Sequence, residues 1–175
     1  MRREHPSSTL LRDFDALRAR ATLSPMNPAS TTYRTESELV ADLMQHLGKD
    51  GFAIGSEFNY SRGKTDVVVL DGGTGEVSAI EAKLTRWRVA LHQAYRNTCF
   101  AHRSYVALPV TTAALAARYS AEFLDRSVGI LAVSKDGVEV LLEAAFAVPV
   151  QGWLTDIAIA SVKGRELCSP PKLSD

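Results

Sequence analysis

The chain has 175 residues, 46% of them hydrophobic, which is enough to bury the core of one ordinary domain. Lysine and arginine total 20, aspartate and glutamate also total 20, and the resulting formal charge of zero excludes the overall basic excess of a nucleic-acid coat protein. The two cysteines are widely separated, which argues against a disulfide framework and a zinc site. The sequence shows no apolar leader and no apolar run long enough to span a membrane, so we expect a soluble cytoplasmic protein.

Residues 1–32 are expected to form a separate arginine-rich helix and linker. Within residues 9–21, apolar side chains recur at helical spacing, namely Leu10, Phe14, Leu17 and Ala21. The prolines and small polar residues that follow are typical of a linker. The first 34 residues hold six arginines against three acids, a surplus compatible either with an arm that touches nucleic acid or with an ordinary chain terminus. The main domain is predicted over residues 33–145, and residues 146–175 are expected to pack on it and to end loosely.

A capping box predicts where the first helix of the main domain begins. Thr35 and Glu38 stand three positions apart at the start of an apolar helical stripe, and the helix should end near Gly48. Glu36 precedes Leu39 by three positions and so falls on the buried stripe, whereas Glu38 is placed to cap. Glu36 is therefore a candidate functional carboxylate, or a residue that only interacts with the helix N-terminus.

Three strands are predicted to follow, at residues 52–59, 65–70 and 77–83. The glycine-rich stretch between the last two indicates a hairpin loop, so these strands should pair antiparallel. If the loop is symmetric, Asp66 lies directly opposite Glu81, and the strand period of two places Lys83 on the same face as Glu81. A slip of one residue would move Asp66 off that face, so the prediction depends on the register.

Two opposed carboxylates at the end of an apolar stripe need a compensating charge. They repel each other and raise each other's pKa unless a cation lies between them. Mg²⁺ is the simplest cation here, because it binds one or two carboxylates together with water and phosphate oxygens. Solvated carboxylates are the ordinary alternative, but Val68 and Val77 on the same face are apolar. Arg62 and Lys64 add positive charge just before Asp66, where a phosphate would lie.

The next helix is predicted from about Arg86 to Ala101, and no aspartate or glutamate occurs from Leu84 to Arg103. A row that could follow a phosphate backbone is formed by Arg88, His92, Arg96, Cys99 and Arg103. A solvated helix face is the other explanation of such a row. Gln93 lies beside the packed stripe, where it would either reach a metal-bound water or a phosphate or make a hydrogen bond at the helix edge.

The remaining elements complete an α/β domain. They are a strand at 104–109, a helix at 112–124 and two strands, at 128–133 and 138–142, joined by an Asp-Gly turn. The element order is helix-strand-strand-strand-helix-strand-helix with a closing hairpin. We therefore expect a central mixed sheet flanked by helices.

Three short motifs resemble the PD-(D/E)xK nuclease superfamily, whose members share the restriction-endonuclease-like fold. Asp66 resembles the acid of the second strand, Glu81-Ala82-Lys83 resembles the acid-x-lysine signature, and Gln93 resembles the glutamine found in several branches. Thr65 stands where a proline is common in the family, a departure that many members share. The resemblance covers about residues 35–109 and implies a restriction-endonuclease-like core.

The resemblance implies a metal-dependent nuclease that hydrolyses phosphodiester bonds, with DNA favoured over RNA. Asp66, Glu81 and the Ala82 carbonyl would bind Mg²⁺ or Mn²⁺, and Lys83 would orient the attacking water or stabilise the developing charge. Glu36 and Gln93 are the further catalytic candidates. The residues expected to contact nucleic acid are Arg62, Lys64, Arg86, Arg88, Arg96 and Arg103. A catalytically silent fold that binds nucleic acid or a protein is the alternative, and a homodimer or larger complex is compatible with either function.

Overall fold

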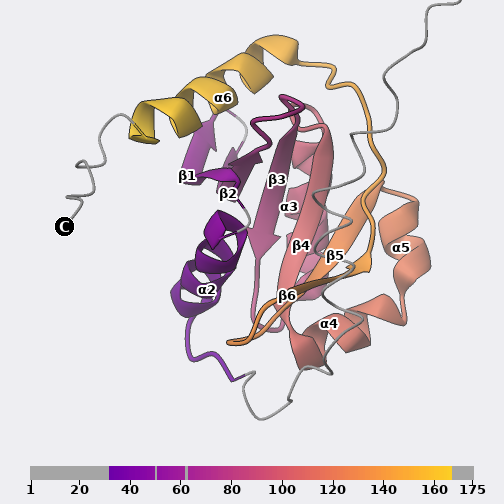
Figure 1. The fold of residues 1–175 in the computed structure, drawn as a ribbon. Coiled ribbons are helices and arrows are strands. Elements are labelled where there is room, and N and C mark those ends of the chain that lie inside the picture. The colour runs from indigo at the N-terminus through magenta and orange to yellow at the C-terminus, as the bar shows by residue number, and fades with distance from the viewer. Residues whose placement is uncertain (1–31, 50, 62, 167–175) are drawn as a thin grey trace, which may run out of the picture.

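The computed structural model describes residues 32–49, 51–61 and 63–166, which form a mixed six-stranded sheet flanked by helices (Figure 1). The strands are β1 (Ala53–Tyr60), β2 (Gly63–Leu70), β3 (Val77–Ala82), β4 (Arg103–Pro109), β5 (Val128–Val133) and β6 (Val138–Leu142). The helices are α2 (Glu36–Lys49), α3 (Trp87–Asn97), α4 (Val110–Ala117), α5 (Ser120–Leu124) and α6 (Gly152–Glu166). The predicted helix over residues 9–21 and Arg62 lie outside the described residues.

The order of strands across the sheet equals their order in the chain, β1 to β6. The two pairs β3–β4 and β4–β5 are parallel, and the other pairs are antiparallel. Each parallel pair is joined by a helical crossover, α3 in the first case and α4 with α5 in the second. The predicted α/β class and element order are confirmed, and the mixed sheet between helices is consistent with a restriction-endonuclease-like core.

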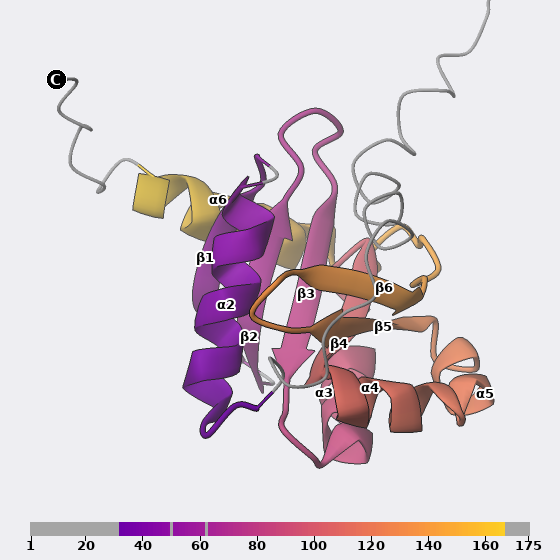
Figure 2. The same ribbon diagram turned by 60° about the horizontal axis from the view of Figure 1, so that its bottom comes forward.

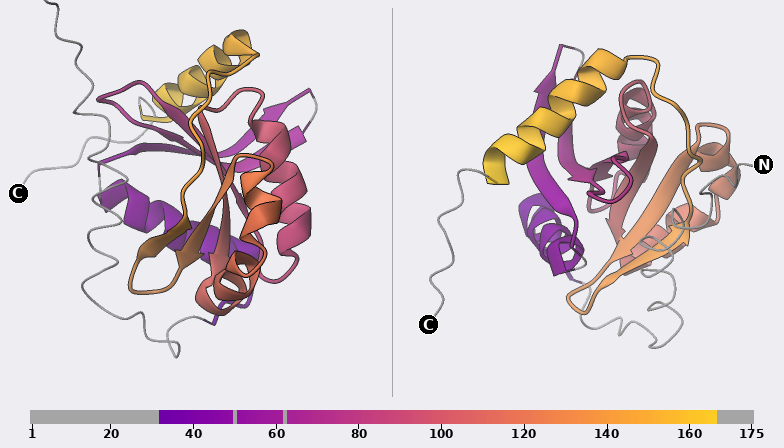
Figure 3. Two further views of the ribbon diagram at one scale, coloured as in Figure 1. Left: turned by 90° about the vertical axis from the view of Figure 1, so that its right-hand side faces the viewer. Right: turned by 45° about the horizontal axis from the view of Figure 1, so that its top comes forward.

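Helices cover both faces of the sheet. Successive residues of the central strands point to opposite faces, and on both faces most of these residues are apolar and buried. On one face, α2 packs its Leu39, Leu43 and Leu47 against Val67 and Ile80. The other face is covered by α3, α4 and α5 over β4 and β5, and by α6 over β1 and β2. Figure 2 shows α2 in front of the sheet with α3 and α6 behind it, and Figure 3 shows α6 running across one end of the molecule.

Two helix boundaries differ from the predicted ones. Helix α3 ends at Asn97 and not near Ala101, because the backbone N–H groups of Thr98 and Cys99 bond to carbonyls three residues back, in tight turns. These turns bring Phe100 onto the sheet, where it is fully buried. Arg103, predicted on the same helical row as Arg88, consequently belongs to β4.

The helix predicted over residues 112–124 begins at Val110 and is divided into α4 and α5. The division falls where Arg118 and Tyr119 donate backbone hydrogen bonds to the carbonyls of Leu115 and Ala116, again three residues back. Helix α2 extends one residue beyond Gly48, to Lys49. No helix among the described residues is long and apolar enough to cross a membrane.

The C-terminal segment packs on the sheet as far as it is described. Leu154, Ala158 and Val162 recur at intervals of four in α6 and lie in one buried cluster with Phe58 and Val68. Before α6, the backbone N–H groups of Ala147 and Gln151 bond to the carbonyls of residues 102 and 99, 2.9 Å away in both cases. Residues 144–151 therefore run as a strap along the end of α3. The predicted division at residues 32 and 145 remains a prediction.

Candidate metal and phosphodiester site

The β2–β3 register agrees with the symmetric hairpin that the sequence predicts. Leu70 pairs with Val77 and Val68 with Ala79, and the last paired residues are Val67 and Ile80. Asp66 and Glu81 are the next positions on the two strands, beyond the end of this ladder. The predicted pairs Leu70–Val77 and Val68–Ala79 are therefore confirmed, and the direct opposition of Asp66 and Glu81 stays a prediction.

The regular strand pairing is interrupted on both sides of Asp66. On the β3 side the half-buried Asp66 accepts a hydrogen bond at Oδ2 from the backbone N–H of Ala82, 2.9 Å away. On the β1 side the paired positions go from Ser56–Val67 to Phe58–Thr65, so the ladder is interrupted where Glu57 stands opposite Asp66.

Glu57 has a φ of 58°, in the left-handed region that residues other than glycine rarely adopt. Such a conformation costs about 1–3 kcal/mol and is concentrated at functional sites. The strain and the interrupted pairing fall at the same point of the sheet as Asp66. Together they mark this strand position as a local departure from regular β-structure.

Glu81 is the most buried charged side chain of the site, with 1% of its surface exposed. Its Oε1 accepts a hydrogen bond of 2.7 Å from the side-chain amide of Asn97 in α3. Its Oε2 is also buried but has no hydrogen-bond partner among the residues that the structure describes. A carboxylate held by one oxygen leaves the other for a ligand, because an unsatisfied buried charge is costly.

The electrostatics of Glu81 follow from this environment. Burial is the largest influence and, together with the nearby charge of Asp66, raises its pKa to about 7. The Asn97 hydrogen bond and the charges of Lys83 and Arg96 act in the opposite direction. A divalent cation at Oε2 would favour the ionised form further, so the arrangement fits a hard cation with oxygen ligands.

A chain of two hydrogen bonds that sequence reasoning missed connects Glu81 to β1. The hydroxyl of Tyr60 donates to Oδ1 of Asn97 at 2.8 Å, and the amide of the same Asn97 donates to Glu81. Asn97 is fully buried and lies one helical turn after Gln93. Asn97 shares the helical row of Gln93 beside the packed stripe, and this placement of a polar amide is the signal in the sequence that could have found it.

Lys83 occupies a different place from the one the strand period predicts. Its ammonium lies 2.8 Å from Oε2 of Glu36, at the start of α2, whereas Glu81 faces α3. Lys83 follows the end of β3, so its long side chain can reach around the end of the sheet. It remains close enough for its charge to lower the pKa of Glu81.

Glu36 is half exposed, so the prediction that it points into the core is wrong. It lies on the first turn of α2, where solvent reaches it, and the pairing with Lys83 connects it to the candidate site. The capping residue is as predicted, since the N–H of Glu38 donates to Thr35 Oγ1 at 3.2 Å. The carboxylate of Glu38 accepts from the backbone N–H of Arg34 at 2.8 Å.

Gln93 is half-buried on α3, and its Oε1 is buried without a hydrogen-bond partner within residues 32–49, 51–61 and 63–166. Gln93 Oε1 is therefore, like Oε2 of Glu81, a buried acceptor atom without a partner among the described residues. The hydrogen bond from α3 to Glu81 comes from Asn97, and the expectation that Gln93 reaches a metal-bound water or a phosphate stays a prediction.

The predicted basic residues fall into two groups. Arg96 is exposed on α3, Arg86 is exposed at the capping position just before it, and Lys64 is exposed but paired with Glu57 at 2.7 Å. Arg88 is paired with Glu122 at 2.9 Å and stacks on Trp87 and Tyr119. The side chain of Arg103 contacts Glu76, Glu143 and the Ala144 carbonyl and is only 18% exposed.

The predicted row along α3 is therefore wrong as a continuous surface. Tertiary contacts engage Arg88 and Arg103 in holding elements together, and the end of the helix at Asn97 separates Arg103 from the others. Arg86 and Arg96 are exposed, and Arg88 is 57% exposed although it is paired with Glu122.

Within the described part of the chain, no three histidine, cysteine, aspartate or glutamate side chains come together as a ligand set. The donor set expected from the sequence is two carboxylates, of Asp66 and Glu81, and the Ala82 carbonyl. Such a set is typical of Mg²⁺ sites, which keep several waters and bind phosphate oxygens of the substrate. The buried Oε2 of Glu81 fits this chemistry.

Comparison with known proteins shows the fold. No family model and no curated protein matches the chain. A solved structure of SPO1766, a protein of unknown function from Silicibacter pomeroyi, is similar with a TM-score of 0.59 and 19% identity over 78% of this chain and 90% of that one. A repair endonuclease from Pyrococcus abyssi is similar with a TM-score of 0.37 and 16% identity, over 59% of this chain and 49% of that one. The first similarity supports the α/β fold, and the site rests on its own geometry.

Proposed function

We propose that this protein is a Mg²⁺- or Mn²⁺-dependent nuclease that hydrolyses phosphodiester bonds, with DNA as the preferred nucleic acid. The observation that carries the proposal is the state of Glu81, a fully buried carboxylate with one oxygen held by Asn97 and the other without a partner among the described residues. The charges of Asp66 and Lys83 both act on it. A fully buried carboxylate with a half-buried acid and an ammonium nearby has no evident structural purpose.

The ligands of the cation would be Asp66, Glu81 and the Ala82 carbonyl. When bound, the cation would lower the pKa of a water molecule and neutralise charge on the phosphate. Asp66 is oriented by the Ala82 N–H, which occupies only one of its two oxygens at 2.9 Å. Asn97 orients Glu81 in the same way and leaves Oε2 for the ligand.

Lys83 and Glu36 act together in this proposal. The ammonium of Lys83 favours the ionised form of Glu81, which cation binding requires. Glu36 holds that ammonium at 2.8 Å, in a geometry that a phosphate or an attacking water can share. Gln93 offers its buried Oε1 as an acceptor for water, and Arg86 and Arg96 offer exposed positive charge to the strand.

Cleavage assays test the proposal. Supercoiled plasmid and single-stranded DNA and RNA are incubated with Mg²⁺ or Mn²⁺ and with wild type, Lys83→Ala or Lys163→Ala. Lys163 is exposed on α6 and serves as the matched control for loss of one lysine. We expect Lys83→Ala to lower the cleavage rate by a factor on the order of 100, typical for removal of one group that stabilises developing charge, and Lys163→Ala to leave it unchanged.

Binding of nucleic acid without cleavage of any substrate would contradict the proposal and would favour the catalytically silent fold. Equal rates for Lys83→Ala and wild type would contradict the role given to Lys83. Cation binding is measured separately, from the Mn²⁺ signal in electron paramagnetic resonance. Asp66→Asn should weaken that binding, whether or not a substrate has been found.

A further inference from the structure

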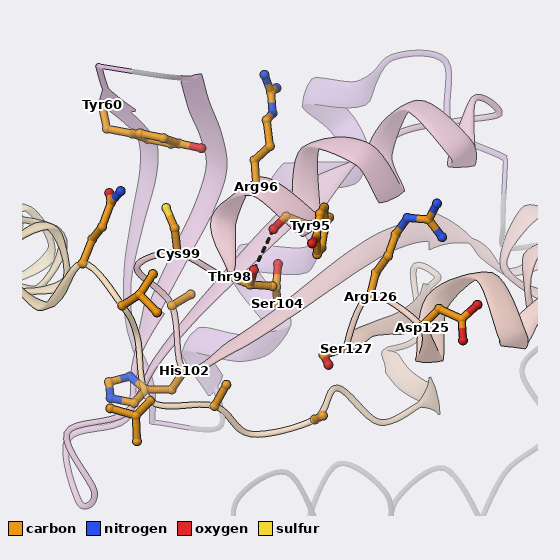
Figure 4. Close-up of a pocket in the computed structure, with 16 residues that line it drawn as sticks. Tyr60, Tyr95, Arg96, Thr98, Cys99, His102, Ser104, Asp125, Arg126 and Ser127 are labelled. Carbon is orange, nitrogen blue, oxygen red and sulfur yellow. Dashed lines mark hydrogen bonds between the residues drawn. The ribbon is translucent and has the colours of Figure 1, made fainter.

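A cavity of about 630 Å³ opens beside the candidate site, between the end of α3, the first residues of β4 and the strap of residues 144–151 (Figure 4). It lies within the size range of small-molecule binding pockets. Its polar lining side chains include Tyr60, Tyr95, Arg96, Ser104, Arg126 and Ser127.

Tyr60 and Arg96 connect this cavity with Glu81. The Tyr60 hydroxyl is the first donor of the chain that runs through Asn97 to Glu81, over hydrogen bonds of 2.8 and 2.7 Å. Arg96 lines the cavity, and its charge also lowers the pKa of Glu81. A ligand in the cavity would therefore lie next to the proposed cation site.

The walls combine an exposed aromatic ring with apolar side chains at the rim. Tyr95 is 50% exposed, and Figure 4 shows it in the middle of the lining residues, between Ser104 and Arg126. Val148 and Val150, from the strap, are 79% and 86% exposed. An exposed flat ring in a cavity with apolar side chains in its lining suits the face of a nucleobase, because stacking on aromatic side chains tolerates any base.

The charges of the lining suit a phosphodiester backbone. Arg96 extends from α3 toward the outside of the cavity in Figure 4. Arg126 is anchored through one guanidinium nitrogen, which donates to the Glu122 carbonyl at 2.7 Å, and its remaining donors are not engaged by that bond. Asp125 is the acid in the lining, so two arginines outnumber it. The base would lie on Tyr95, and its phosphates would lie by the two arginines.

We propose that this cavity receives one unpaired nucleotide of the strand that is cut, so that the preferred substrate is single-stranded or has an unpaired segment beside the scissile bond. This inference rests on the proposed nuclease function and adds the substrate class. A base within a duplex is paired and stacked, and it enters a cavity of this kind only after it has been unpaired, which costs free energy.

Fluorescence anisotropy with a labelled 12-nucleotide oligothymidylate, in EDTA, measures this binding without any cleavage. A duplex of the same length is the comparison. Wild type should bind the single strand more tightly than the duplex. Tyr95→Ala should weaken single-strand binding about tenfold, in the range found for loss of one stacking side chain, while Tyr95→Phe keeps the ring and should retain it.

The arginine is tested against a matched control. Arg96→Ala should weaken binding of the oligonucleotide, whereas Arg118→Ala removes an equal charge from an exposed position away from the cavity and should have little effect. Circular dichroism melting confirms that each variant folds. Equal binding by Tyr95→Ala and wild type, or equal losses for Arg96→Ala and Arg118→Ala, would overturn the assignment of the cavity.

Parallel cleavage assays separate the two proposals. If wild type cuts single and double strands equally well and Tyr95→Ala does the same, the cavity proposal is overturned and the nuclease proposal stands. If single-strand binding depends on Tyr95 but wild type cuts no substrate with Mg²⁺ or Mn²⁺, the nuclease function is overturned, and with it the inference that the bound strand is a substrate.

Discussion

Replacing Glu81 by glutamine removes a buried negative charge while keeping the shape of the side chain. In the native protein the pKa of Glu81 is raised from 4.5 to about 7, chiefly by burial. The folded state therefore binds this proton more tightly than the unfolded state does. The contribution of Glu81 to stability is fully present below pH 4.5 and is lost as the pH rises through about 7. The difference corresponds to about 3 kcal/mol in the free energy of unfolding.

Urea denaturation in EDTA at pH 5 and pH 8 measures this effect. The stability of Glu81→Gln relative to wild type should increase by about 2–3 kcal/mol between the two pH values, because only wild type acquires the buried charge and a small part of the effect is already present at pH 5. In thermal melts, the same change corresponds to a relative gain of about 5–10 °C for a domain of this size. Asp156→Asn, at an exposed position of α6, is the control and should show no such change.

Metal addition gives the complementary measurement. At pH 8, Mn²⁺ should stabilise wild type, because the cation binds the folded state and compensates the charge of Glu81, and it should stabilise Glu81→Gln much less. The reasoning is refuted if wild type and Glu81→Gln show the same pH dependence in EDTA. That result would mean that Glu81 titrates like an exposed carboxylate.

Two further predictions concern the backbone around the site and the packing of the sheet. Glu57→Gly should be more stable than Glu57→Val by about 1–2 kcal/mol, because glycine adopts the φ of 58° without strain and both variants lose the carboxylate equally. Urea denaturation measures the two free energies of unfolding. Equal values would contradict the backbone strain at this position. A Cβ at Gly129 would lie 2.4 Å from the Tyr105 ring and 2.6 Å from the Leu142 carbonyl, so Gly129→Ala should cost about 1–3 kcal/mol. Gly72→Ala has open space around its Cβ and is the control, so similar melting temperatures for the two alanine variants would count against the packing argument.

The strand pairing that places the two acids could be predicted because its determinants are local. Continuous apolar runs indicate two buried strands, and a short glycine-rich loop joins them. A symmetric loop between antiparallel strands fixes which residues pair, whereas a slip of one residue would exchange the two faces. The observed pairs Val68–Ala79 and Leu70–Val77 confirm this register up to Val67 and Ile80, the positions before Asp66 and Glu81.

Long-range contacts were beyond such reasoning. The pairing of Lys83 with Glu36 joins residues 47 positions apart, and the pairing of Arg88 with Glu122 joins residues 34 positions apart. Helical spacing tells which side of a helix an arginine occupies, but an acid from another element decides whether it is available to a ligand. The position of Arg88 on α3 was predicted, whereas its pairing with Glu122 was not, and its contact with nucleic acid stays a prediction.

The sequence by itself determined the α/β class, the order of the elements and the pairing of the strands that carry Asp66 and Glu81, because apolar runs, loop length and helix spacing are local properties of the chain. The tertiary structure alone decided the state of those carboxylates. Asn97 holds one oxygen of Glu81 only because α3 crosses the sheet at that point, and the crossing depends on the packing of many side chains at once. Burial, the raised pKa and the cavity beside Tyr60 all result from that packing.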